Sequence, residues 1–177
     1  STGASWVTTA PVPIEDFAWD DLDAGGVTDL GKAFEMLAAQ LTIPPMSERA
    51  LPPVLVLLSD GQPTDDYKKS LDKLLHLPWG KKAVRIAISI GQDADDDVLE
   101  QFTGNRELVL QANNPQALVK MIKWASTAAS VVSAPASRPK DVEEFAVPKD
   151  PGASNAPLVL DMNNIPDPAS IGAGDVW

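Results

Sequence analysis

The sequence contains no cysteine and only one histidine, His76. The lack of cysteine excludes disulfides, thiolate metal sites and cysteine nucleophiles, and one histidine cannot supply a histidine-based metal site. Basic residues are also scarce, because 14 Lys and Arg stand against 25 Asp and Glu and leave a net charge of -11. A chain of this charge has little with which to neutralise phosphates, so we expect it to bind neither nucleic acid nor anionic membranes.

Long apolar runs are missing as well. No stretch approaches the roughly 20 residues that a membrane-spanning helix needs, and the first residues lack the charged and apolar regions of a signal peptide. Together with the lack of cysteine, this pattern predicts a cytoplasmic protein. The hydrophobic fraction of 44% in 177 residues is enough for the core of one domain.

The most informative stretch runs from Pro53 to Asp65. Its first half, Val54–Leu58, is apolar without alternation, which predicts a strand buried on both faces in the middle of a parallel sheet. Its second half has the composition of a turn, in which Gly61 lets the backbone turn tightly. Asp60 would then lie at the carboxyl end of a central strand, where open α/β sheets bind ligands and a carboxylate can hold a hard cation.

Helices and strands are predicted to alternate on both sides of this stretch. Apolar spacing and cap residues predict helices at 29–41, 67–75, 93–102 and from 115 onward, and strands at 83–91 and 108–110. The alternation predicts a doubly wound α/β fold, with a mostly parallel sheet and helices on both faces. A further strand is expected at Trp6–Ala10, and Trp6, Trp79 and Trp124 are expected in or near the core.

The composition changes after residue 134. We expect a domain over 1–134, a linker rich in Pro, Ala and Ser over 135–156, and a tail over 157–177. The tail contains one apolar segment, formed by Leu158, Val159 and Leu160, and it ends in Trp177. An aromatic residue after a linker is a natural anchor for a partner's pocket, so these residues are predicted to dock onto a partner or onto the domain itself.

Two motifs point together to a family. The first is Gly25-Gly26-Val27-Thr28-Asp29-Leu30, and the second is Leu57-Leu58-Ser59-Asp60-Gly61-Gln62-Pro63-Thr64-Asp65. In this order they resemble the von Willebrand factor A domain, in particular its bacterial branch associated with tellurium resistance. The resemblance covers residues 6–134. It implies a doubly wound fold with a metal-ion-dependent adhesion site at the top of the sheet.

The resemblance also assigns the site residues. It implies that Thr28 and Asp60 are ligands of Mg²⁺ or Mn²⁺ and that a partner's carboxylate completes the shell of the cation. The residues that would support these loops around the metal are Gly26, Asp29, Gly61 and Asp65.

One part of the family pattern is missing. The Asp-x-Ser-x-Ser loop of the family occurs nowhere in the chain, and the strands that accompany it would precede Trp6. Without them the strand before Asp60 loses a neighbour, and two protein ligands plus water would bind a cation weakly. Three explanations stay open: a complementary N-terminal fragment exists, a partner or second copy supplies the missing part, or Pro157–Asp161 inserts as a substitute strand.

The implied function is protein interaction without catalysis. We expect an adaptor whose loops at the top of the sheet bind a protein partner through the metal. The bacterial branch implies phosphatase or kinase partners in stress or tellurium-resistance systems. The alternatives are a Mg²⁺-dependent phosphoryl-group enzyme that uses the carboxylates around Asp60, and a fragment with a non-functional metal site. The lack of a general base and of a basic phosphate clamp argues against the enzyme.

Three other patterns are weaker. Gly26–Ala33 nearly fits a phosphate-binding P-loop, but Ala33 occupies the position that needs a hydroxyl and Asp29 would repel phosphate. Asp93–Asp97 has the spacing of a calcium loop without its glycine and glutamate, so we expect these acids to cap a helix. His76 is expected to have a structural role at the end of a helix.

Overall fold

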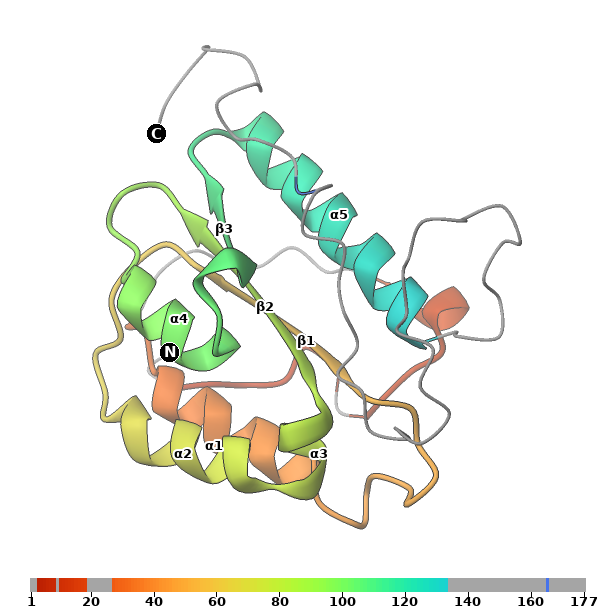
Figure 1. Ribbon diagram of the computed structural model, residues 1–177. Helices are drawn as coiled ribbons and strands as arrows, with labels where there is room; N and C mark the ends of the chain where they lie inside the picture. Colours follow the sequence, from red (N-terminus) through yellow and green to blue (C-terminus); the bar gives the residue numbers. More distant parts are fainter. Residues whose placement is uncertain (1–2, 9, 19–26, 134–164, 166–177) are drawn as a thin grey trace, which may run out of the picture. The chain divides into compact units, whose positions relative to one another are not determined.

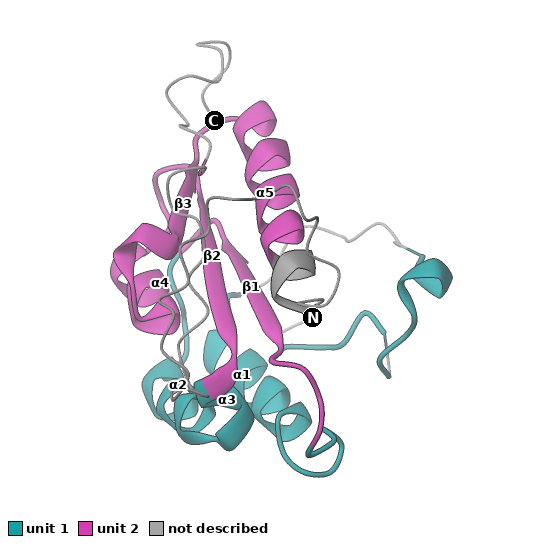
Figure 2. Ribbon diagram, turned by 45° about the vertical axis from the view of Figure 1, so that its right-hand side comes forward, with its two compact units in different colours: residues 1–48, 62–81 teal, residues 49–61, 82–177 magenta. Residues whose placement is uncertain are grey.

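The computed structural model describes residues 3–8, 10–18, 27–133 and 165. The chain divides into two compact units, which are coloured separately in Figure 2. The unit formed by Ser1–Glu48 and Gln62–Lys81 is called the helical unit here, and the unit formed by Arg49–Gly61 and Lys82–Trp177 is called the sheet unit.

The helical unit is built on α1 (Leu30–Gln40) and α2 (Tyr67–His76), which pack against each other (Figure 1). A short turn of helix, η1 (Ile14–Asp16), precedes them in the chain, and α3 (Pro78–Lys82) follows. The buried residues of α1 and α2 recur three or four positions apart, as amphipathic helices require. They include Leu30, Phe34 and Ala38 on α1 and Tyr67, Leu71 and Leu74 on α2.

The segment after α2 corrects one prediction. The sequence predicted a helix over 67–75 and no further helix before the strand at 83–91, but Pro78 and Gly80 belong to an additional helix, α3. Proline is well suited to the first position of a helix, because its missing N–H has no partner there in any case. A Cβ atom at Gly80 would overlap the carbonyl oxygen of Leu74, so glycine permits a close approach here. Trp79 between them is buried, as predicted.

The sheet unit contains three parallel strands in the order β1-β2-β3. They are β1 (Val54–Ser59), β2 (Val84–Ile90) and β3 (Val109–Ala112). Helix α4 (Asp96–Thr103) and the short turn η2 (Arg106–Leu108) lie between β2 and β3 in the chain, and α5 (Pro115–Ser133) follows β3. From α1 to α5 the order of helices and strands is the predicted one apart from the additional helix α3, and it gives the predicted α/β fold with a parallel sheet.

Helices cover both faces of this sheet. Successive side chains of β2 point to opposite faces, and each face contacts a different helix. Ile86 and Ile88 belong to a buried cluster with Met121 of α5. On the opposite face, the Nε of Arg85 donates a hydrogen bond of 2.8 Å to the carbonyl oxygen of Phe102 in α4. The position of α5 and α4 on either side of the strands can be followed in Figures 1 and 2.

The predicted cap of α4 is confirmed, and α5 has a local cap as well. The Asp95 carboxylate accepts a hydrogen bond of 3.2 Å from the backbone N–H of Val98 at the start of α4. Gly104 ends the same helix with φ 75°, a left-handed conformation that glycine adopts without strain. The side-chain oxygen of Asn114 accepts a bond of 2.7 Å from the N–H of Ala117 at the start of α5. Local caps of this kind are set by neighbouring residues, which is why the sequence predicts them.

The prediction that Val54–Leu58 forms a strand of the parallel sheet is confirmed, but its central position and its burial on both faces are not found among the described residues. Within the described residues, β1 pairs with β2 alone and therefore lies at an edge of the sheet. Val56 and Leu58 are 40% and 44% exposed, so the strand is not buried on both faces. An apolar run indicates side chains that favour burial, but it does not say which element covers them.

The predicted strand at Trp6–Ala10 is also wrong. The described residues of this segment form no strand, and Trp6 is 46% exposed. Its aromatic and β-branched composition fits a pleated surface, but a strand also needs a partner to pair with. Trp124 does pack against the cluster below α5, as expected.

Candidate functional site

In the helical unit, Thr28 lies in the loop before α1 and is hydrogen-bonded to the segment that precedes α2. The carbonyl oxygen of Thr28 accepts hydrogen bonds from the backbone N–H of Thr64 at 3.0 Å and from its hydroxyl at 3.1 Å. Thr28 is half-buried, and its own hydroxyl has no hydrogen bond to any described residue. Its backbone is therefore held in place while its hydroxyl oxygen remains available to a ligand.

Asp65 makes a second connection between the same two segments. Its carboxylate accepts hydrogen bonds from the backbone N–H groups of Gly31 at 2.9 Å and Lys32 at 3.1 Å. These N–H groups belong to the first turn of α1, where the helix leaves its donors without internal partners. Asp65 therefore caps a helix whose first turn is 34 residues earlier in the chain. Both helices begin at the same end of the pair in Figure 1.

Asp29 occupies the N-cap position of α1, but its side chain forms no capping hydrogen bond. The sequence predicted a helix from residue 29 with a local cap. The position is predicted correctly, but the function of the side chain is taken over by Asp65. Asp29 keeps its favourable charge at the positive end of the helix dipole.

In the sheet unit, Asp60 follows β1 at its carboxyl end, as predicted. The residue is exposed, and no described residue donates a hydrogen bond to its carboxylate. The turn beside it is closed by the hydroxyl of Ser59, which donates to the carbonyl oxygen of Gly61 at 3.0 Å. The Asp60 carboxylate is therefore a solvated oxygen donor on a defined turn.

Gly61 does not have the role that we expected. Its φ is not in the positive region where the described glycines 3, 91 and 104 lie, and a Cβ atom at Gly61 would meet no atom within 4 Å. The turn after β1 therefore does not depend on glycine for its backbone conformation. The lack of a side chain leaves the space beside Asp60 open.

The oxygen donors fit a hard cation by type, but those described are few. Thr28 belongs to the helical unit and Asp60 to the sheet unit, so their joint binding of one cation stays a prediction. Among the described residues, no three His, Asp or Glu side chains come together in a way that could hold a metal. A hard cation takes about six oxygen ligands, so water, a partner or residues beyond those described would have to supply the rest.

The remaining predicted site residues cannot be placed. Gly26 and the tail residues Leu158, Val159, Leu160 and Trp177 lie outside the described part of the chain. Their roles stay predictions.

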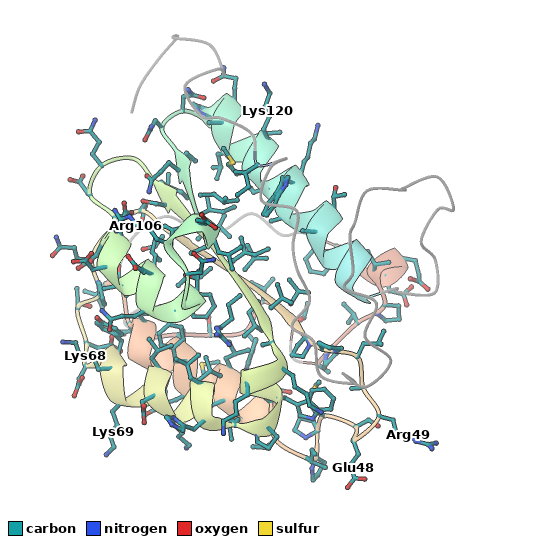
Figure 3. The ribbon with its side chains drawn as sticks, in the orientation of Figure 1. Glu48, Arg49, Lys68, Lys69, Arg106 and Lys120 are labelled. Atoms are coloured by element: carbon teal, nitrogen blue, oxygen red, sulfur yellow. The ribbon has the colours of Figure 1, made fainter. Side chains whose placement is uncertain are left out.

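A small pocket in the sheet unit was not predicted from the sequence. Its volume is about 290 Å³, and it is lined by Asp96, Arg106, Val109 and Gln111. The Nε2 of Gln111 donates to the Asp96 carboxylate at 2.9 Å, and Arg106, labelled in Figure 3, pairs with Glu100 at 3.0 Å. The charged groups thus have protein partners, although one carboxylate oxygen of Asp96 is buried without one. No sequence motif marks this pocket.

His76 is exposed, and its Nδ1 lies 2.8 Å from the carbonyl oxygen of Asp72 in the last turns of α2, in agreement with a structural role.

None of the helices in the described ranges is long and apolar enough to cross a membrane.

Comparison with known proteins supplies the family. The family model described as von Willebrand factor type A domain matches residues 16–124, which is more than half of the chain. Two solved structures of proximal thread matrix protein 1 from the mussel byssus, one described as having a zinc-occupied MIDAS motif, are 21% and 22% identical, with TM-scores of 0.44 and 0.43. The aligned regions cover 63% and 70% of this chain but only 26% and 29% of those chains. No curated protein matches the chain.

The parallel α/β sheet, the acid after β1 and the match over residues 16–124 lead to one conclusion. The chain belongs to the von Willebrand factor type A domain family.

Proposed function

We propose that the chain is a non-catalytic protein-interaction module that binds a protein partner through a divalent cation. Thr28 and Asp60 supply protein oxygens to the cation, Mg²⁺ or Mn²⁺, and a carboxylate of the partner completes its shell. When bound, the cation would supply a positive charge that bridges two sets of oxygen ligands. The same proposal assigns residues 1–134 to the interaction domain, 135–156 to a linker and 157–177 to a docking tail.

One observation supports this proposal most directly. Neither the Thr28 hydroxyl nor the Asp60 carboxylate bonds to a described residue, so both oxygen donors are available to a cation. The nearby carboxylate of Asp65 is fully committed, with each of its oxygens bonded to a different N–H of α1. This division assigns Asp65 to holding the Thr28 loop and leaves Thr28 free to bind.

The class of partner follows from charge and from the family. A cation held by few protein ligands has open positions that a carboxylate fills well, so the partner contact is an exposed Asp or Glu. The bacterial branch that the motifs resemble suggests a cytoplasmic phosphatase or kinase as the partner, in a stress or tellurium-resistance system. The missing ligand loop could come from a complementary N-terminal fragment or from a second copy.

The proposal is tested by titrating the full chain with Mn²⁺ and Mg²⁺ in a calorimeter. We expect weak binding to the unsubstituted chain and an affinity about tenfold lower in Thr28→Ala and in Asp60→Ala, because each removes a direct ligand. Asp93→Ala is the matched control, since it removes an exposed acid of the sheet unit that the proposal does not use. Its affinity should equal that of the unsubstituted chain.

A double variant decides whether the two residues share one ion. If Thr28 and Asp60 hold the same cation, Thr28→Ala together with Asp60→Ala should lose less than the sum of the two single losses. Strictly additive losses would indicate two separate weak sites. Unchanged binding in both single variants would remove the metal from the proposal.

A further inference from the structure

The exposed side of α2 carries three lysines, although the chain as a whole is acidic. The exposed residues of this helix lie on one stripe opposite its buried residues, as the helical repeat requires, and they are Lys68, Lys69, Asp72, Lys73 and His76. The three lysines are called the lysine face here. None of them forms an ion pair with a described residue. Asp72 lies instead beside His76, with 3.3 Å between its carboxylate and the Nδ1 of the ring.

The lysines occupy positions that the stability of a helix disfavours. Lys68 and Lys69 belong to the first turn of α2, at the positive end of the helix dipole. Lys69 and Lys73 are four residues apart, so two like charges are neighbours on the helix surface. Residues that oppose the local preferences of their element are typical of functional sites. A ligand of negative charge therefore explains the lysine face better than the stability of α2 does.

The lysine face begins close to the loop of Thr28, in the same helical unit. The backbone N–H of Thr64 donates to the carbonyl oxygen of Thr28 at 3.0 Å, and Lys68 follows Thr64 by four residues. Four residues span at most about 14 Å, so the first lysine lies within the length of a short peptide from Thr28. Lys68 and Lys69 are labelled in Figure 3, where they project from the start of α2.

We propose that the lysine face binds an acidic segment of the protein partner, next to the carboxylate that binds the cation. This inference rests on the proposed function and specifies its partner, which should carry several Asp or Glu side chains within a short stretch. An extended segment advances about 3.3 Å per residue, so acids about four or five residues from the metal-bound carboxylate would reach the lysines. Each lysine ammonium group has three N–H donors that carboxylate oxygens can accept.

A short protein segment fits this face better than a larger polyanion does. The net charge of -11 opposes the approach of an extended anionic surface, such as a membrane or a nucleic acid. An acidic segment carries few charges, and at physiological ionic strength charges more than about 8 Å away are largely screened. The segment would therefore interact mainly with the lysines that it contacts.

Fluorescence anisotropy of a labelled peptide of alternating Glu and Gly tests the proposal on the full chain, at low ionic strength and with EDTA present. Lys68→Glu together with Lys69→Glu should weaken binding about tenfold, because two attractive charges become repulsive. Lys68→Arg together with Lys69→Arg should retain it, because the charge is kept. A peptide of alternating Gln and Gly should bind less well than the acidic peptide to the unsubstituted chain.

The matched control is Lys120→Glu together with Lys123→Glu, which reverses two exposed lysines of α5 and changes the net charge by the same amount. It should leave binding of the acidic peptide unchanged. Equal losses in the two double variants would show that only the overall charge acts and would overturn the proposal, as would equal binding of the Gln and Glu peptides. Tighter binding of phosphatidylserine vesicles or single-stranded DNA, lost in the same α2 variant, would assign the face to a polyanion and overturn the acidic segment.

Adding Mn²⁺ in place of EDTA separates this inference from the proposed metal site. Mn²⁺ should strengthen binding of the acidic peptide, and Thr28→Ala together with Asp60→Ala should lose this gain but keep the dependence on Lys68 and Lys69. Dependence on the lysines without any effect of Mn²⁺ would support the lysine face and count against the metal-bridged contact. An effect of Mn²⁺ without dependence on the lysines would overturn the lysine face and leave the metal-bridged contact.

Discussion

Replacing Asp65 by alanine should weaken the helical unit more than replacing any other acid near the start of α1. The carboxylate bonds to two N–H groups of the first turn, at 2.9 Å to Gly31 and 3.1 Å to Lys32. Its removal leaves both donors without their partner and separates α1 from the segment that begins α2. Asp29 occupies the N-cap position itself but makes no such bond.

The magnitude follows from these two bonds. Loss of an N-cap side chain costs about 1 kcal/mol, and hydrogen bonds to a charged acceptor contribute about 1.5–3 kcal/mol. The bond to Gly31 is partly buried and the bond to Lys32 is exposed, so the second is weakened by competing water. We expect Asp65→Ala to lower the free energy of unfolding by about 2 kcal/mol. Asp29→Ala should lower it by about 0.5 kcal/mol, through the helix dipole alone.

Urea unfolding followed by far-ultraviolet circular dichroism measures these differences. Asp65→Asn should lie between the two alanine variants, because its amide keeps one acceptor oxygen but loses the charge. Asp66→Ala serves as the neighbouring control, since the side chain of Asp66 makes no capping bond at the start of α2. If Asp29→Ala proved as costly as Asp65→Ala, the helix would be capped locally and the assignment of Asp65 would be wrong.

Substitutions at three further positions test packing and hydrogen bonds by the same urea measurement. In an unobstructed helix, replacing glycine by alanine raises the free energy of unfolding by about 1 kcal/mol. At Gly31 the added Cβ would lie 2.9 Å from backbone atoms of residues 66 and 67, so we expect Gly31→Ala to lower the free energy of unfolding. A net gain would contradict this close approach. Arg85→Lys should cost about 1–2 kcal/mol, because lysine cannot reproduce the 2.8 Å bond from Nε to the end of α4; a neutral result would show that the bond contributes nothing. Asn114→Ala should cost about 1 kcal/mol or more by removing the 2.7 Å cap of α5, whereas Asn114→Asp should keep most of it.

Local sequence signals predicted the regular elements well. The helices α1, α2, α4 and α5 have apolar side chains at helical spacing, and this period depends only on residues within each helix. The caps at Asp95 and Asn114 act within three residues of their own position, so the sequence around them is sufficient. The parallel sheet follows from the alternation of these elements with β-branched runs.

The cap supplied by Asp65 could not be predicted in this way. Its partners are 34 and 33 residues away, and the sequence offers a local candidate, Asp29, at the N-cap position. Asp65 itself precedes α2, where an acid has an obvious local role at the helix dipole. Only the packing of α1 on α2 brings its carboxylate to the other helix. The motif that contains Asp65 therefore did not reveal that this acid caps α1.

The edge position of β1 could not be predicted either. Val54–Leu58 is as apolar as a strand with two neighbours, yet only β2 pairs with it among the described residues. Composition reflects what the segment buries in its complete environment, including parts of the chain beyond those described and any partner. A strand that is apolar and, among the described residues, paired on one side only is therefore typical of a strand whose complete environment covers its other side.

The edge and the candidate metal ligand are connected through one strand. Asp60 directly follows β1, and its turn is closed by the single bond from Ser59 to Gly61 at 3.0 Å. A strand held on one side only opens more readily than a strand held on both, so the direction of the Asp60 carboxylate should depend on what fills the outer edge.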